Sequence, residues 1–155
     1  LGINTYDITP GGHNNSLSIN TFVAQPLICY ESIFSAESLV LEKNVDFILN
    51  VSNDGWFGET LAPYQHLDAL VMRSLENQRY SVRSTNTGIS AIISSKGVIE
   101  DHVKFNKTGM INRKIVSRNG ITPLSMYGYE ILYFLFFIVF LYSAIYFNIK
   151  LFRRL

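Results

Sequence analysis

VDFILNVSNDGWFG, residues 45–58, is an apolar run that ends in a turn. The part VDFILNVS is short, mostly apolar and β-prone, which is typical of a strand buried on both faces. NDGWFG has the Asn, Asp and Gly of a turn and carries Trp56 and Phe57, which we expect to be exposed. A strand of this kind belongs in the middle of a covered sheet.

On either side of this run, strand and helix patterns alternate. Pro26 cannot donate to a ladder, so the strand that contains it should be irregular there or lie at an edge. Strands that alternate with helices favour an α/β layered domain. The sequence predicts a strand over 17–30, a helix over 32–44, a helix over 62–79, two or three short strands over 80–101 with turns at NTG and SKG, and a last strand over 109–116.

The composition sets limits on the whole chain. Its 155 residues are enough for one domain with its own core. The formal net charge of +1 gives no reason to expect a nucleic-acid partner. Residues 1–16 are rich in turn formers and lack the pattern of a signal peptide, so they look like the middle of a domain.

The C-terminal segment differs in kind from the rest. Residues 131–149, ILYFLFFIVFLYSAIYFNI, contain no charged side chain and are long enough to cross a bilayer. A buried core helix is the alternative, but so small a domain could hardly cover a helix that is apolar all round. We therefore expect an α/β domain over 1–123, a juxtamembrane linker over 124–130, a transmembrane helix over 131–149 and a basic tail over 150–155.

Basic residues close to the span indicate its orientation. Lys150, Arg153 and Arg154 follow the apolar segment directly, whereas the basic residues before it lie further away. Because cytoplasmic flanks are enriched in Lys and Arg, the C-terminus should be cytoplasmic and the α/β domain should lie on the outer side of the membrane.

Cys29, in LICYESIF (27–34), is the only cysteine of the chain. A lone cysteine can be a small buried hydrophobe. Here, however, it ends a predicted strand and precedes a predicted helix. In α/β sheets reactive groups collect beyond the carboxyl ends of strands, and a helix N-terminus stabilises a thiolate and offers N–H groups to an oxyanion. The sequence favours a nucleophile.

The remaining ionisable residues predict no further centre. His66 has no second ligand at metal spacing, so we expect a structural or hydrogen-bonding role, and His102 should be solvated. Arg83 could brace the site or lie on the surface. Neither a metal nor a cofactor is expected. A polar helix face is predicted from Asp68, Arg73, Glu76 and Arg79.

The motifs ICYE, SNDGWFG, QHL, RSLENQR and STNTG, followed by ITPLSMYGYE and an apolar segment, resemble the C-terminal part of apolipoprotein N-acyltransferases. The resemblance covers nearly the whole chain. It implies the C-terminal half of a nitrilase-like α-β-β-α sandwich followed by one transmembrane helix. Cys29 would be the nucleophile, the backbone N–H of Tyr30 would serve the oxyanion hole, and Glu31 would orient the site. Asn53, Trp56 and Phe57 would lie where substrate approaches.

The resemblance also implies a reaction and its partners. A phospholipid would donate an acyl chain to Cys29, and the α-amino group of a lipoprotein's diacylglyceryl cysteine would accept it, at the bacterial inner membrane with the domain facing the periplasm. The family's catalytic Glu and Lys precede the cysteine, but residues 1–28 contain neither. Asp7 and His13 are the ionisable residues there, and neither matches a family motif.

Three functions therefore stay open. The first is an N-acyltransferase or a fragment of one. The second is a membrane-tethered amidase or nitrilase, which would share the thioester stage. The third is a catalytically incomplete remnant, or a domain that pairs with a separately encoded N-terminal half.

Overall fold

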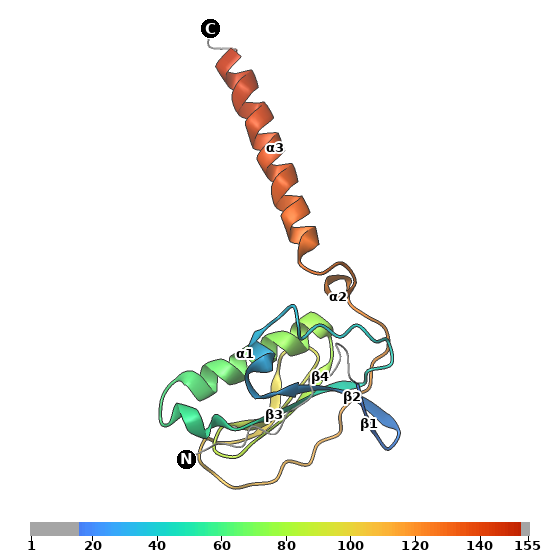
Figure 1. Ribbon diagram of the computed structural model, residues 1–155, viewed down its shortest axis with the longest axis vertical. Coiled ribbons are helices and arrows are strands. Elements are labelled where there is room, and N and C mark those ends of the chain that lie inside the picture. Colours follow the sequence, from blue (N-terminus) through green and yellow to red (C-terminus); the bar gives the residue numbers. More distant parts are fainter. Residues whose placement is uncertain (1–15, 153–155) are drawn as a thin grey trace, which may run out of the picture.

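A computed structural model describes residues 16–152 of the chain (Figure 1). Its described strands form one sheet in the order β1-β2-β3-β4-β5-β6, in which β2, β3 and β4 are parallel and the other pairs are antiparallel. This arrangement confirms the α/β class. The strands are β1 (Leu17–Ile19), β2 (Phe22–Ile28), β3 (Phe47–Ser52), β4 (Tyr80–Thr85), β5 (Ser90–Ile93) and β6 (Ile99–Val103).

Of the two helices predicted within the α/β domain, one forms. The long helix of the domain is α1 (Ala62–Asn77), which agrees with the prediction over 62–79. Two short 3₁₀ turns follow strands: η1 (Cys29–Ile33) after β2 and η2 (Asp54–Phe57) after β3. Two further helices, α2 (Pro123–Tyr127) and α3 (Glu130–Phe152), end the described chain.

The predicted helix over 32–44 is wrong. After η1 this segment continues as turns, because tertiary bonds occupy its backbone. The side chain of Asn77, on α1, accepts from the N–H of Val40 at 2.6 Å and donates to the carbonyl of Ser38 at 3.0 Å. Such side-chain bonds compete with the helical ladder.

The predictions of a single strand over 17–30 and of a last strand over 109–116 also need correction. The segment 17–30 is a hairpin of β1 and β2, with Asn20 at φ 53° in the turn between Ile19 and Phe22. Pro26 lies in β2 beyond the residues that pair with β1, which explains how a proline is tolerated inside the sheet. The segment 109–116 is not a strand; there Arg113 is tied to Asp101 of β6 by an ion pair at 3.1 Å.

The core lies between α1 and one face of the sheet. Leu67 and Leu70 of α1 pack with Ile48 of β3 and Ile93 of β5. Cross-strand register puts Leu27, Asn50 and Arg83 on this same covered face. Because this face is covered, the polar side chains of Asn50 and Arg83 need hydrogen-bond partners within the protein.

The opposite face of the sheet remains partly open. Register places Ile28, Val51 and Ser84 side by side on it. Ile28 and Val51 are 65% and 49% exposed, and Phe22 on the same face of β2 is 44% exposed. An apolar sheet face with this exposure is what half of a two-sheet sandwich would present.

The C-terminal helix extends away from the α/β domain (Figure 1). α3 includes the whole predicted segment 131–149, and its window Glu130–Phe147 is long and apolar enough to cross a membrane, with none of it buried in the protein. Gly128, between α2 and α3, has φ 59° and ψ −158°, a conformation that is almost restricted to glycine.

Polar contacts hold the foot of α3 to the end of α1. Glu76 accepts from Arg73 Nη2 at 2.8 Å and from the Tyr129 hydroxyl at 3.2 Å, and its carbonyl accepts from Thr122 at 2.8 Å. The predicted polar face is therefore wrong for Arg73 and Arg79, which are both buried. Arg79 donates to the carbonyls of Val45 and Gly120.

Candidate functional site

Cys29 lies where β2 ends and η1 begins, as the sequence predicts. Its φ is 51°, in the left-handed region, which costs a residue other than glycine about 1–2 kcal/mol. Cys29 is a free cysteine, and the residue is half-buried. Cys29 thus occupies a strained turn at the C-terminal end of β2.

Buried polar groups contact both the carbonyl oxygen and the sulfur of Cys29. Its carbonyl oxygen lies 3.0 Å from His66 Nε2 and accepts from Asn50 Nδ2 at 3.2 Å. Its sulfur lies 3.4 Å from the hydroxyl oxygen of Ser52. The hydroxyl of Ser32 lies 3.0 Å from the same His66 nitrogen and donates more weakly, at 3.4 Å, to the same carbonyl.

Asp54 is the centre of this network. Its carboxylate accepts from Ser52 Oγ at 2.6 Å and from Arg83 Nη2 at 2.7 Å, and it lies 3.1 Å from His66 Nδ1. Burial alone would raise the pKa of Asp54, but the hydrogen bonds from His66 and Ser52 and the charge of Arg83 lower it to about 2. Asp54 is thus a buried carboxylate that stays ionised.

Arg83 connects this carboxylate to the thiol. Burial lowers the pKa of Arg83, while the charge of Asp54, its hydrogen bond to Asp54 and the charge of Cys29 act in the opposite direction. The guanidinium also donates to Asn50 Oδ1 and to the Ile89 carbonyl. Arg83 therefore braces the site, which decides between the two roles that the sequence left open.

Glu31 and Tyr30 follow Cys29 in the turn. Glu31 Oε2 accepts from the N–H of Ile28 at 2.6 Å, so this carboxylate caps the start of η1. The i to i+3 bonding of a 3₁₀ turn leaves the N–H groups of its first two residues, Cys29 and Tyr30, without a partner inside the turn. These N–H groups are the donors that could meet an oxyanion.

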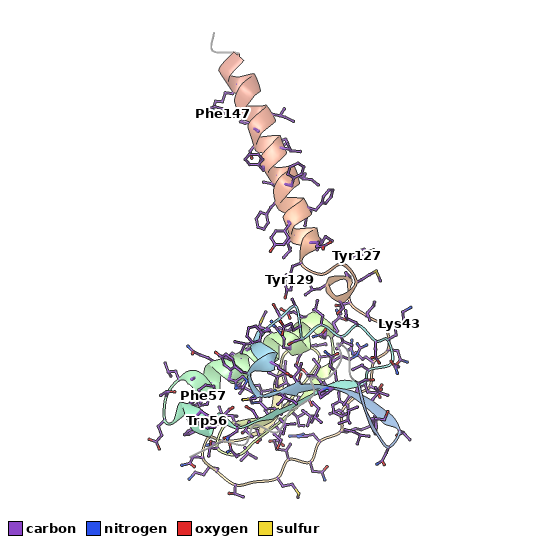
Figure 2. The ribbon with its side chains drawn as sticks, viewed as in Figure 1. Lys43, Trp56, Phe57, Tyr127, Tyr129 and Phe147 are labelled. Carbon is purple, nitrogen blue, oxygen red and sulfur yellow. The ribbon has the colours of Figure 1, made fainter. Side chains whose placement is uncertain are left out.

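The loop after β3 contains the other three predicted site residues, Asn53, Trp56 and Phe57, and each has a different environment. Phe57 lies 6.1 Å from the Tyr30 ring and 5.9 Å from the His66 ring, so it packs beside the thiol turn. Trp56 is 84% exposed, at the same end of the domain as Phe57 (Figure 2). Asn53 caps η2 through Gly55 N at 3.1 Å and accepts from Asn86 at 2.6 Å, which ties this loop to the next one.

The sequence did not point to the buried network itself. Asn50, Ser52 and Asp54 alternate along β3 and into its turn, and this period of two was the available signal that a polar row faces inward. His66 is buried with hydrogen bonds on both ring nitrogens, as predicted, and His102 is exposed. Asp7 and His13 lie outside the described residues. No cluster of metal-ligating side chains occurs within 16–152.

Sequence comparison finds one matching protein family, carbon-nitrogen hydrolase, over residues 9–119. An apolipoprotein N-acyltransferase of Wigglesworthia glossinidia brevipalpis is 35% identical over 92% of this chain and 29% of its own length. Another, of Coxiella burnetii, is 38% identical over 79% of this chain and 26% of its own length. The chain thus spans less than a third of these relatives.

A solved structure supports the same fold. A CN-hydrolase superfamily protein from Xanthomonas campestris, whose crystal structure contains an arsenic adduct in the active site, aligns with a TM-score of 0.52 at 15% identity. The alignment covers 79% of this chain and 48% of that protein. At this identity the likeness concerns the fold alone, and it agrees with half of a larger domain.

Proposed function

The chain belongs to the carbon-nitrogen hydrolase family, and from this premise we propose that it is the C-terminal part of an apolipoprotein N-acyltransferase. The observation that carries the proposal is Cys29 in a left-handed conformation at the end of β2, on a chain that ends in the apolar helix α3. The named relatives support the choice of reaction over most of the chain's length.

In the proposed reaction, the thiolate of Cys29 attacks the carbonyl carbon of a phospholipid ester. The tetrahedral oxyanion collapses to a thioester and releases a lysophospholipid. The α-amino group of a diacylglyceryl cysteine then attacks the thioester, which forms the amide and returns the thiol. Splitting the transfer in this way replaces one difficult step by two easier ones.

We assign roles to the residues around Cys29 on the same basis. The N–H of Tyr30 stabilises the oxyanion, since the turn leaves it free. Glu31 orients the turn through its bond to Ile28. Trp56, which is exposed, and Phe57, which is half-buried beside the Tyr30 ring, contact the acyl chain, and Asn53 fixes their loop.

α3 supports a membrane location. Residues 131–149 cross the inner membrane, 124–130 link the helix to the domain over 1–123, and 150–155 form a cytoplasmic basic tail. The α/β domain faces the periplasm. In this arrangement both lipid substrates are concentrated at the membrane that carries the site.

A second half completes the site. Residues 1–28 contain neither the Glu nor the Lys that the family resemblance implies. The partly open apolar face with Phe22, Ile28 and Val51 is suited to the second sheet of a sandwich. An upstream or separately encoded half would supply both the sheet and the missing side chains, and without it the chain would be inactive.

The amidase or nitrilase alternative would use the same thioester and differ in the acceptor. A helix whose 18-residue window Glu130–Phe147 is apolar and not buried favours lipid substrates over small soluble amides. Hydrolysis of a small amide by the assembled protein, without any transfer to an amine, would favour the alternative.

The test uses membranes that contain the chain together with the family's N-terminal half, given a phospholipid with a radiolabelled acyl chain. Label should attach to the chain and be released by hydroxylamine, and Cys29→Ser should abolish it. Met110→Ser is the matched control, because it removes a sulfur-bearing side chain that is 90% exposed. Label that persists in Cys29→Ser would refute the nucleophile.

A further inference from the structure

The carbonyl of Cys29 and the N–H of Tyr30 belong to one peptide group. This group is planar, and since the described chain contains no cis peptide bond, its C=O and N–H point in opposite directions. Any contact that fixes the direction of the carbonyl therefore fixes the direction of the N–H. The proposed oxyanion donor is thus set by whatever binds the oxygen of Cys29.

Two buried side chains bind that oxygen. His66 Nε2 lies 3.0 Å and Asn50 Nδ2 3.2 Å from it. A carbonyl oxygen only accepts, so this contact is a hydrogen bond in the form of the His66 ring that carries a proton on Nε2. His66 is 2% exposed and Asn50 is fully buried, so neither donor can exchange its bond for one to water.

Both donors are themselves held by Arg83. The guanidinium donates to Asn50 Oδ1, lies 3.0 Å from His66 Nδ1, and is paired with Asp54. Asn50 and His66 come from β3 and α1, so the carbonyl of Cys29 is bound from two elements that Arg83 of β4 joins. The Ser32 hydroxyl also donates to that oxygen. One donor would satisfy the carbonyl, so the two contacts from His66 and Asn50 exceed what the turn requires.

We propose that His66 and Asn50 are positioning residues: by binding the carbonyl of Cys29 they aim the N–H of Tyr30 at the oxygen that becomes negative during acyl transfer. The assignment rests on the proposed role of Cys29 as an acylated nucleophile. It adds two residues that contact neither substrate nor sulfur. A reaction at the same sulfur that forms no oxyanion should be indifferent to them.

Two reactions of the 155-residue chain in detergent distinguish an effect on the direction of the Tyr30 N–H from an effect on the fold. Both reactions are run at the same alkaline pH, about 9, so that the absence of a general base affects them equally. Acylation by p-nitrophenyl butyrate passes through a tetrahedral oxyanion and releases p-nitrophenolate. Alkylation by iodoacetamide is a direct displacement and forms none. Neither reagent requires the lipid substrates, so a wrong lipid assignment leaves this test readable.

His66→Leu should slow acylation roughly 10-fold or more, because a misdirected oxyanion donor loses part of the 10²- to 10³-fold effect of such a donor. Its alkylation rate should stay within about twofold, the change expected if the thiolate itself is intact. His66→Gln, whose amide can donate from nearly the position of Nε2, should recover most of the acylation rate. Asn50→Asp keeps the size and the acceptor for Arg83 but cannot donate, so it should repeat the selective loss if His66→Leu fails to fold.

Equal losses in both reactions would show that these residues only maintain the fold, and would overturn the proposal. Unchanged acylation in His66→Leu, or a Gln variant as slow as the Leu variant, would overturn it as well. Failure of the wild-type chain to take label from phospholipid, with a normal response in these two reactions, would instead count against the proposed substrate.

Discussion

Asp54→Asn should be among the most destabilising single changes in the domain. The Asp54–Arg83 ion pair has both side chains 0% exposed, and Asp54 also accepts from Ser52. The Asn side chain keeps one acceptor oxygen, but its NH₂ group would face a group that donates to Asp54, either the Ser52 hydroxyl or the Arg83 guanidinium. Removing one partner of a buried pair leaves an uncompensated charge, which costs about 3–5 kcal/mol.

The pKa of Asp54 gives a second measure of the same interaction. Its fall from 3.8 to about 2 means that the fold prefers the ionised carboxylate by about 2 kcal/mol. The loss in Asp54→Asn should include a contribution of this order. With a urea slope of roughly 2 kcal/mol per M, a loss of 3–5 kcal/mol moves the unfolding midpoint down by about 1.5–2.5 M.

The assay is urea unfolding of the chain in detergent, followed by circular dichroism. Asp101→Asn is the matched control, because its ion pair with Arg113 is 40% and 52% exposed and should contribute at most about 1 kcal/mol. If the Asp54→Asn midpoint moves no further than that of Asp101→Asn, the network does not hold the site in the way described.

Three more outcomes are expected. Because the pKa of Asp54 is depressed in the fold, its contribution is complete above about pH 4 and is lost as the pH falls toward 2; acid titration should show a stability loss in that window that is absent in Asp54→Asn. Gly88→Ala should destabilise strongly, by about 3 kcal/mol, since the new Cβ would lie 2.0 Å from the ion-paired Asp54 Oδ2, whereas Met110→Ala in an exposed segment should be neutral in the same unfolding assay. A membrane-impermeant maleimide added to intact spheroplasts should label Cys29, the single cysteine; labelling only after permeabilisation would reverse the proposed orientation.

The sequence predicted best where one periodicity runs without interruption. The apolar run that became β3 and the helical spacing that became α1 needed no long-range information. The hairpin of β1 and β2 was missed because its turn, Asn20–Thr21, lacks the glycine that usually marks a two-residue loop. The helix over 32–44 was wrong because Asn77, far along the chain, binds that backbone.

In the candidate site, too, local features could be predicted from the sequence and long-range contacts could not. The position of Cys29 follows from local pattern, a strand end followed by a turn. The network around it does not, because His66 and Arg83 lie 12 and 29 residues from Asp54 and are brought to it by packing. The left-handed φ of Cys29 is likewise invisible in the sequence, since only the surrounding bonds maintain such a conformation in a residue with a side chain.

α1 separates the two ends of the molecule. Its C-terminal turn is tied to the foot of α3 through Glu76, while its N-terminal end adjoins the loop that carries Trp56 and Phe57 (Figure 2). Sixteen helical residues make this rod about 24 Å long. The loop with Trp56 and Phe57 therefore lies about one helix length from the residues that tie α3 to the domain.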